Sequence, residues 1–359
     1  MQVVGSSRGI EHVLISEQSR QTAKEASLQY VSNSRVGINR KRRGKKFQYL
    51  LKGKLITDEI TLLRIKKLAI PPAWTNVWVC QSSTGHIQAT GFDTKKRKQY
   101  RYHTQWNTYR NQTKFHKLYE FGKALPALRK CIEHDIINSN LTKEKVLATV
   151  VSLMERTFIR IGNSEYEKLY GSYGLTTLKD NHVRVNGQEL KFSFKGKKGI
   201  YHSIMLKSKR LAKIVKACRD IPGKELFQYL NEDGTASTID SGMVNNYIKE
   251  ATGKDFSAKD FRTWAGSLSI LSSFKAQKEA LTENEIKKNI ICALEEVSAK
   301  LGNTRSVCKK YYVHPEIISL YEQNGLQKYL KHLDEIEKCD DITDLTQEEK
   351  ILMKLLRKF

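Results

Sequence analysis

The feature that most constrains this fold is a run of three short β-strands joined by two tight turns. The turn Asn186-Gly187 follows the first strand and KGKKG (195–199) follows the second. Asn-Gly between alternating strands is the strongest short signal for a β-hairpin. The pattern therefore predicts a three-stranded antiparallel meander, made of HVRV (182–185), ELKFSF (189–194) and IYHSIML (200–206).

Most of the sequence beyond residue 105 outside this meander has helical periodicity. The segment 143–163, KEKVLATVVSLMERTFIRIGN, is strongly apolar, and Gly162-Asn163 is expected to end its helix as a C-cap pair. The predicted fold class is α+β, with a mostly α-helical C-terminal domain that contains the meander.

The N-terminal part predicts a smaller domain built on a β-sheet. Residues 1–34 are polar and weakly patterned, so we expect a flexible arm. A helix over 56–70, capped by Thr57, ends at PPAW and leads into short strands. We place the domain boundary near residue 107, which gives an N-terminal domain of 35–107 and a C-terminal domain of 108–359. The expected strands are VWVC (77–80), GHIQATGFD (85–93) and the one entered through TKKRKQYRYH (94–103).

The charge balance of the chain points to a polyanionic partner. Lys and Arg number 63 against 38 Asp and Glu, a formal net charge of +25. The first 110 residues are the most basic, with 21 Lys and Arg against 6 Asp and Glu. Nucleic acid is the first interpretation of such an excess; an anionic membrane surface or a merely solvated basic surface are the alternatives.

The cysteine pattern and the hydropathy predict a protein of a reducing compartment without a membrane span. No two cysteines form a C-x-x-C pair, which argues against zinc and redox motifs. The N-terminal segment MQVVGSSRGIEHVLIS has no long apolar core, and no apolar run is long enough to cross a bilayer. The six cysteines are at positions 80, 131, 218, 292, 308 and 339.

Several catalytic motifs are missing from the sequence. It contains no G-x-x-x-x-G-K-[ST] loop for ATP, no G-x-S-x-G, no H-E-x-x-H and no acidic triad spaced for magnesium. If the protein cuts nucleic acid, we therefore expect it to do so without a metal, a nucleotide or another cofactor.

Metal-free cleavage of a phosphodiester requires a nucleophile, cationic donors for the non-bridging oxygens and an acid for the departing oxygen. Arginine suits the donor role because its planar fork matches two phosphate oxygens. Arg160 lies between two isoleucines in FIRIGN, and Arg262 has the same apolar setting in KDFRTWAG. Each is either a phosphate ligand or a buried ion-pair partner. Lys197, in the KGKKG turn, is either a cation that enters a groove or an ordinary solvated lysine.

Taken together, several sequence blocks resemble the type IB DNA topoisomerases. Any single block would be a weak signal, but the combination extends from about residue 35 to about residue 320. IPPAWTNVWVC, GHIQATGFDTKKRKQYRYH and ALPALR are similar to the bacterial branch, which itself resembles the poxvirus enzymes. The blocks that look like family signatures are RIGNSEYEKLYGSYGLTTL, FSFKGKKG, KDFRTWAG and LGNTRSVCKKYYVHP.

The resemblance implies a role for each matching residue. Arg160 and Arg262 match the two catalytic arginines, and Lys197 matches the lysine that serves as general acid. Lys259 matches the lysine three positions before the second arginine. Tyr312 matches the nucleophile.

The resemblance leaves alternatives at two places, the nucleophile and the residue at position 303. In the family the tyrosine follows the His or Asn of a GHT or GNT block by nine positions, which selects Tyr312 over Tyr311 and leaves Tyr311 as a packing residue. The block here is GNT, so Asn303 stands where the poxvirus and cellular eukaryotic enzymes have histidine. We expect Asn303 to donate to a phosphate oxygen through its amide, more weakly than histidine would.

The strand RKQYRYH is the candidate DNA-contacting element of the N-terminal domain. Tyr100 and Tyr102 share one face of it, and cations interleaved with aromatic residues suit nucleic-acid contact. The alternative is a half-buried strand with solvated basic residues. By resemblance, Arg97, Gln99, Tyr100 and Tyr102 match residues that touch the major groove, and Tyr166 in NSEYEK matches a DNA-contacting tyrosine.

The implied function is relaxation of supercoiled duplex DNA through a 3′-phosphotyrosyl intermediate, strand swivelling and religation. The expected enzyme is a monomer that clamps duplex DNA, with no membrane or nucleotide partner. It would work in the cytoplasm at a bacterial nucleoid or, if viral, in the virion or host cell. The rivals are a tyrosine recombinase, which uses the same Arg–Lys–Arg–Tyr chemistry, and a non-enzymatic architectural DNA-binding protein.

Overall fold

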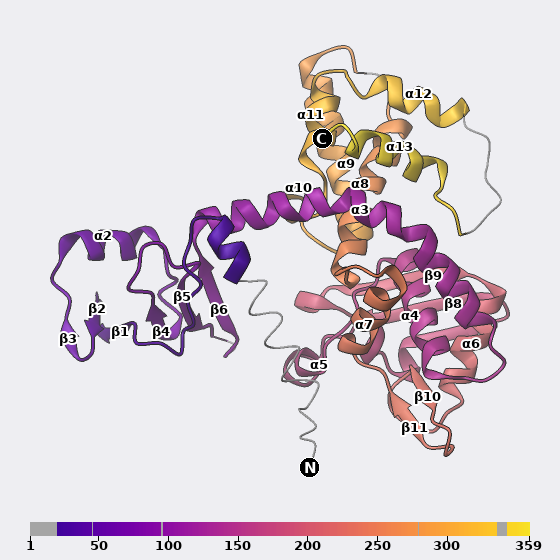
Figure 1. The fold of residues 1–359 in the computed structure, drawn as a ribbon, viewed down its shortest axis with the longest axis horizontal. Coiled ribbons are helices and arrows are strands. Elements are labelled where there is room, and N and C mark those ends of the chain that lie inside the picture. The colour runs from indigo at the N-terminus through magenta and orange to yellow at the C-terminus, as the bar shows by residue number, and fades with distance from the viewer. Residues whose placement is uncertain (1–19, 45, 95, 279, 336–342) are drawn as a thin grey trace. The chain divides into compact units, whose positions relative to one another are not determined.

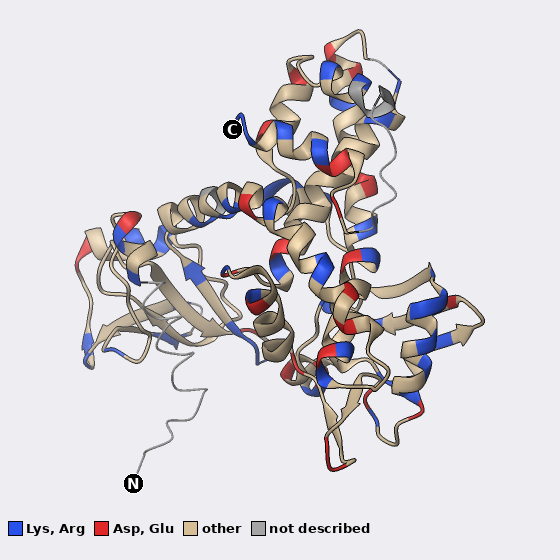
Figure 2. Cartoon of the chain, turned by 45° about the vertical axis from the view of Figure 1, so that its right-hand side comes forward, with Lys and Arg blue, Asp and Glu red and all other residues tan. Residues whose placement is uncertain are grey.

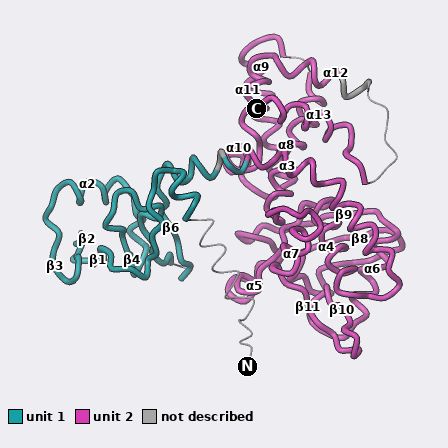
Figure 3. Tube along the Cα trace, in the orientation of Figure 1, with its two compact units in different colours: residues 1–114 teal, residues 115–359 magenta. Residues whose placement is uncertain are grey.

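The computed structural model describes residues 20–44, 46–94, 96–278, 280–335 and 343–359 (Figure 1). The chain divides into two compact units, one up to residue 114 and one from residue 115 onward (Figure 3). This division falls inside the long helix α3 (Thr104–Ile137), later than the boundary near residue 107 suggested by the sequence. Within the described ranges, no helix combines the length and the apolar character needed to cross a bilayer.

The first unit contains a six-stranded antiparallel sheet in the order β3-β2-β1-β4-β5-β6. Helix α2 (Glu59–Lys67) packs against it, and its Ile65 joins strand residues such as Val79 and Ala89 in a small buried core. The predicted N-terminal sheet domain is therefore confirmed. Its strands are β1 (Ile38–Arg43), β2 (Lys46–Leu51), β3 (Lys54–Leu55), β4 (Thr75–Val79), β5 (Ile87–Phe92) and β6 (Lys98–Tyr102).

Two details of the first unit differ from expectation. Asp58, not Thr57, caps α2, because its carboxylate accepts the backbone N–H of Thr61 at 2.8 Å. The expected loose arm is also wrong for residues 20–30. Leu28 is buried in a small cluster with Trp106, and the backbone N–H of Gln29 donates to Thr84 O at 2.8 Å. Of the rest of the predicted arm, residues 1–19 lie outside the described residues, and residues 31–34 are described as an irregular segment with a turn.

The second unit is mostly helical, as predicted, and one large apolar core runs through it. Helix α4 lies at the centre of this core, with most of its residues buried. The helices after α3 are α4 (Lys143–Thr157), α5 (Ser164–Tyr170), α6 (Lys209–Arg219), α7 (Ser241–Thr252), α8 (Ala258–Ala276), α9 (Glu283–Leu301), α10 (Arg305–Tyr311), α11 (Pro315–Glu322), α12 (Gln327–Glu335) and α13 (Gln347–Leu356).

The predicted meander is present as an antiparallel sheet of β7 (Val183–Asn186), β8 (Glu189–Lys195) and β9 (Tyr201–Lys207). Its inner face packs on the core through buried residues of β8 such as Phe192. The sequence prediction missed a second hairpin of β10 (Gln228–Leu230) and β11 (Ala236–Thr238). Its strands are too short to show an alternating pattern.

A charged cluster inside the second unit holds helix α8 in place. Arg129 of α3 pairs with Glu155 of α4 at 2.6 Å and with Glu349 of α13 at 2.8 Å. Glu349 is 3% exposed and also accepts the indole N–H of Trp264, on α8, at 3.0 Å. Three helices thus meet at one buried carboxylate, Arg129 links α4 to them, and one of the three carries Arg262.

Helix α4 ends earlier than the sequence suggested. Its last residue is Thr157, and Phe158 adopts a left-handed conformation with φ 57° that terminates the helix. The predicted C-cap at Gly162-Asn163 is wrong, because Asn163 instead caps the start of α5 by accepting the backbone N–H of Tyr166. Arg160 therefore lies in the irregular segment between α4 and α5, not in a helix.

Candidate active site

Arg160 points from the segment after α4 toward the turn that follows α9. Its guanidinium donates to the side-chain oxygen of Asn303 at 2.7 Å and to the carbonyl of Gly302 at 3.2 Å. Burial lowers the pKa of Arg160 to about 10, and the nearby positive charge of Arg262 contributes. The guanidinium stays charged at neutral pH, in a place where positive charge is unfavourable until an anion arrives.

Arg262 lies on α8 and approaches the same turn. It is 7% exposed and donates to two main-chain carbonyls, Phe158 O and Leu301 O, each at 2.7 Å. Its Nε is buried and has no hydrogen-bond partner in the described part of the chain. Buried donors without an acceptor are uncommon in native proteins, and a bound anion is one way to satisfy them.

Tyr312 lies at the C-terminal end of α10, against Arg262. The guanidinium carbon of Arg262 lies 5.1 Å from the centre of the Tyr312 ring. Helix α8 also contacts the tyrosine backbone. The Ser267 hydroxyl donates to Tyr312 O at 3.4 Å, and a Cβ added at Gly266 would lie 2.4 Å from that oxygen. The same helix therefore positions the arginine and the tyrosine.

Lys197 occupies the turn between β8 and β9. The residue is exposed to solvent, yet its amine is partly surrounded by protein, and this burial lowers its pKa. The positive charge of Arg160 lowers the pKa further, that of Arg262 contributes a little, and Tyr312 acts in the opposite direction. The lysine thus lies within the electrostatic field of the same site.

The site gathers cations without carboxylates. Across the described ranges, no Asp or Glu forms an ion pair with Arg160, Lys197 or Arg262. This excludes the alternative in which the two arginines serve as buried ion-pair partners. Nor do those ranges contain a group of three His, Cys, Asp or Glu residues that could hold a metal ion. The arrangement is suited to a single bound anion.

Asn303 differs from its expected orientation. Its oxygen accepts from Arg160, and its amide nitrogen donates to the carbonyl of Leu301 at 3.3 Å. One of the two amide N–H groups of Asn303 is thus engaged inside the turn, and its oxygen holds the Arg160 guanidinium. In the structure Asn303 orients Arg160.

The basic strand RKQYRYH forms β6, an edge strand of the first unit's sheet. Tyr100 and Tyr102 are exposed and stack with ring centroids 5.9 Å apart. Asp93 holds Arg97 and Gln99, the other two proposed contacts. Its carboxylate accepts from Arg97 Nε at 2.6 Å and from Gln99 Nε2 at 2.9 Å. The four proposed DNA contacts therefore form two pairs: the two tyrosines share one face of the strand, and Gln99, held with Arg97 by Asp93, alternates with them.

The remaining candidates lie in the second unit. Tyr166 is 56% exposed on α5, where its ring tilts against Tyr170 at 5.8 Å. Lys259 is an exposed residue of the first turn of α8, which also carries Arg262. Both are accessible to a ligand. Figure 2 shows Lys and Arg on elements of both units.

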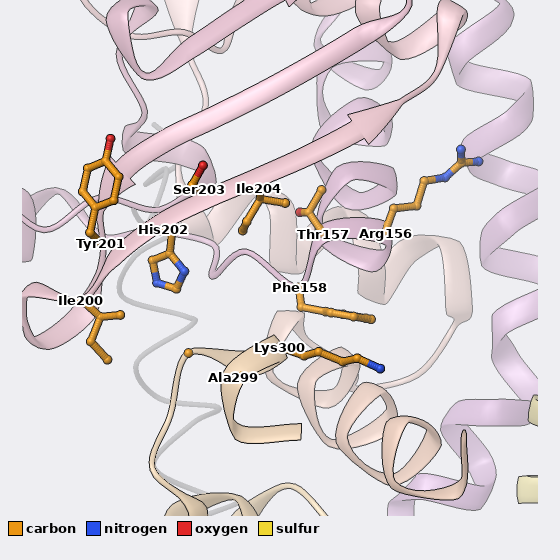
Figure 4. A pocket seen from close by; sticks show the side chains of 11 residues that line it. Arg156, Thr157, Phe158, Ile200, Tyr201, His202, Ser203, Ile204, Ala299 and Lys300 are labelled. Carbon is orange, nitrogen blue, oxygen red and sulfur yellow. The ribbon is translucent and has the colours of Figure 1, made fainter. Parts of the chain in front are cut away.

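Sequence reasoning missed the groups that orient the cations. They are mainly main-chain carbonyls, which carry no sequence signal: Gly302 O for Arg160, and Phe158 O and Leu301 O for Arg262. His202 lines a pocket of about 420 Å³ between β9 and the ends of α4 and α9 (Figure 4). The pocket also includes Phe158, Lys300 and Gly302.

Comparisons with known proteins point to one family. The family described as "Eukaryotic DNA topoisomerase I, catalytic core" matches residues 96–339, and "Bacterial DNA topoisomerase IB, N-terminal domain" matches residues 46–93. The DNA topoisomerase 1B of Acanthamoeba polyphaga mimivirus is 32% identical over 90% of this chain and 95% of its own length. That of vaccinia virus (strain Copenhagen) is 26% identical over 66% of this chain and 72% of its own.

A solved structure of the XerH site-specific recombinase bound to a palindromic difH substrate also aligns. It covers 57% of this chain and 51% of its own, with a TM-score of 0.36 and 16% identity.

The matching family regions and the mimivirus relative establish the class: the chain belongs to the type IB DNA topoisomerases. It is an isomerase that changes DNA topology.

Proposed function

We propose that this topoisomerase relaxes supercoiled duplex DNA by cutting and resealing one strand through a covalent bond to Tyr312. The observation that carries the proposal is the group of three cations beside the Tyr312 ring with no carboxylate partner in the described part of the chain. A scissile phosphate would supply the missing negative charge.

Tyr312 attacks the phosphorus and displaces the 5′ oxygen of the next nucleotide. An ordinary phenol has a pKa of about 10, so the proton must leave as the new bond forms. Arg160 and Arg262 donate to the non-bridging oxygens as negative charge builds on them. Their anchors are main-chain carbonyls and the Asn303 amide, which hold both guanidiniums before DNA arrives. Asn303 acts here by positioning Arg160.

Lys197 protonates the departing 5′ oxygen. Its pKa is lowered by burial and by Arg160, which makes the ammonium a stronger acid than a free lysine. The products are a 3′-phosphotyrosyl ester and a free 5′ hydroxyl. One phosphodiester replaces another, so the reaction reverses without ATP. The three cations supply the charge stabilisation that a metal ion supplies elsewhere.

The first unit supplies additional contacts to duplex DNA. The exposed Tyr100–Tyr102 pair offers one set of contacts to a groove. Arg97 and Gln99, held by Asp93, offer a second set. Tyr166 and Lys259 add contacts from the second unit. We infer that a single copy acts on DNA, because one chain contains the four proposed catalytic residues and Asn303, which positions one of them.

The decisive experiment is to trap the covalent complex on a suicide DNA substrate and map the linked peptide. Wild type should relax plasmid without ATP and give a Tyr312 adduct, whereas Tyr312→Phe should give neither. Tyr311→Phe is the matched control, since Tyr311 is a neighbouring, more exposed tyrosine, and it should retain activity. Relaxation by Tyr312→Phe, or an adduct on Tyr311, would overturn the assignment.

A further inference from the structure

His202 is a half-buried residue of β9 to which the mechanism above assigns no role. Its ring stacks on that of its cross-strand partner Phe194, with centroids 5.2 Å apart and planes 23° apart. Phe194 is 3% exposed, so it is itself fixed in the core. Stacking on a buried ring gives the imidazole a defined place at the edge of the meander.

The turn that carries Lys197 rests on this imidazole. A Cβ added at Gly196, the residue before Lys197, would lie 2.6 Å from both Cδ2 and Nε2 of His202. The backbone N–H of Gly196 donates to Ile200 O at 2.7 Å and closes the turn over the ring. The main chain approaches so closely that a side chain at residue 196 would press on the imidazole.

The imidazole also touches the turn that holds Arg160. A Cβ added at Gly302 would lie 2.5 Å from Cε1 of His202. Gly302 has φ 57°, its carbonyl accepts from Arg160, and the next residue is Asn303. The ring therefore fills the space between the Lys197 turn and the Arg160–Asn303 contact.

An uncharged ring is well suited to this place. Burial lowers the pKa of His202, and the positive charges of Arg160 and Arg262 lower it further. The imidazole thus separates the two turns without adding another positive charge to the three already there. On its other side it borders the pocket of Figure 4, which leaves room for the turn to shift if the ring is removed.

The geometry points to His202 as a positioning residue that sets where the Lys197 ammonium lies relative to the scissile phosphate. This inference rests on the proposed acid role of Lys197. Removing the ring lets the Gly196–Lys197 main chain move into the vacated space. The resulting loss then falls on protonation of the leaving 5′ oxygen, because the Gly302–Asn303 turn that anchors Arg160 has its own backbone hydrogen bonds to Ala299 O and Ser298 O.

The test is single-turnover cleavage of two suicide DNA substrates, one ordinary and one with a 5′-bridging sulfur that leaves without a proton. His202→Ala should slow cleavage of the ordinary substrate by about tenfold to a hundredfold, less than the ~10²–10⁴ of complete loss of an acid. On the sulfur substrate its rate should lie within about threefold of wild type. His202→Gln, similar in volume but never charged, should keep most of the rate on both substrates.

Gly196→Ala tests the same contact from the other side and does not depend on the stability of His202→Ala. Gly196 has φ −93°, which alanine tolerates, so the only new interaction is pressure of the methyl group on the imidazole. It should slow the ordinary substrate selectively, as His202→Ala does. Ser203→Ala is the matched control on the same strand; Figure 4 shows its side chain directed away from His202, and it should cleave both substrates at the wild-type rate.

Lys197→Ala is the reference that separates the two proposals. If the sulfur substrate does not rescue Lys197→Ala, the acid role fails and the inference about His202 fails with it. If the sulfur substrate rescues Lys197→Ala, then full activity of His202→Ala, or equal losses on both substrates, overturns the positioning role alone.

Discussion

At the scale of single residues, His314 shows how burial near the nucleophile affects the protein as a whole. It lies two positions after Tyr312 and is 6% exposed, between the rings of Phe115 and Phe359. Its Nδ1 caps α11 by accepting the backbone N–H of Glu316 at 3.3 Å. Burial lowers the pKa of His314 to about 4, and the neighbouring charge of His116 contributes.

This histidine should make stability depend on pH. In the unfolded chain a histidine binds a proton near pH 6.5. Between that pH and about 4, the unfolded chain holds the proton and the folded chain does not. The free energy of unfolding should therefore fall as the pH falls through this window, by at most roughly 3 kcal/mol. Urea unfolding at pH 7.5, 6 and 5 measures the slope.

His314→Asn keeps an acceptor for the helix cap but cannot titrate. Its unfolding free energy should change less between pH 7.5 and 5 than that of wild type. An unchanged slope in His314→Asn would assign the pH dependence to other groups.

The sequence predicted the cationic residues of the site better than their partners. Arg160, Arg262 and Lys197 stand out because charged residues between apolar neighbours or at a hairpin turn are conspicuous. Asn303 was expected to face a phosphate and instead turns toward Arg160. A side chain's orientation depends on neighbours brought together from distant parts of the chain, and no local pattern encodes them.

At the scale of elements, helix α8 couples the arginine to the nucleophile. It carries Arg262, and beyond it Gly266 and Ser267, which touch the backbone at Tyr312. Ser267 is fully buried; its hydroxyl donates to Tyr312 O and accepts the backbone N–H of His314 at 3.1 Å. Any shift of α8 would therefore move Arg262 and Tyr312 together.

Ser267→Ala should therefore damage catalysis as well as stability. It leaves a buried N–H without its acceptor, at a cost of about 1–3 kcal/mol in unfolding free energy. It also frees the Tyr312 backbone, which we expect to slow cleavage by about tenfold to a hundredfold without weakening non-covalent DNA binding. Single-turnover cleavage and filter binding distinguish the two effects.

Ser272→Ala is the matched control for this prediction. Ser272 lies on the same helix, but its hydroxyl donates only to the carbonyl of Leu268, within the helix, at 3.3 Å. Its loss should change stability by less than about 0.5 kcal/mol and leave cleavage unchanged. Wild-type cleavage by Ser267→Ala would show that Gly266 and the packing of α10 suffice to hold the tyrosine.

Element boundaries were the weaker part of the sequence prediction. The meander was predicted in full because Asn-Gly turns and alternation are local signals. The end of α4 was placed too late because Phe158, an aromatic residue, takes the left-handed conformation that glycine usually supplies. Tertiary packing of the segment that carries Arg160 overrides that local preference.

At the scale of the whole molecule, the net charge of +25 predicts strong dependence of DNA binding on salt. A protein that makes 6–10 phosphate contacts loses roughly 10³–10⁵ in affinity between 50 and 200 mM salt. Titration of Tyr312→Phe with duplex DNA at several salt concentrations measures this slope without covalent chemistry. A slope near zero would contradict phosphate-dominated binding.

The α+β class and the small N-terminal sheet followed from patterning alone. The packing of residues 20–30 did not follow from the sequence pattern, because a few apolar residues such as Ala23 and Leu28 carry no periodic signal. The buried Glu349 that joins three helices was also beyond sequence reasoning, since its partners come from distant parts of the chain.

Main-chain carbonyls anchor the guanidiniums of Arg160 and Arg262, and this affects the enzyme when no DNA is bound. Carboxylates would neutralise them permanently, but amide dipoles hold them in place and leave their charge intact. Between catalytic cycles the protein thus retains mutual repulsion among neighbouring cations, which the incoming backbone of DNA relieves. Small oxyanions in solution would relieve the same repulsion, and would therefore compete with DNA for binding to these cations.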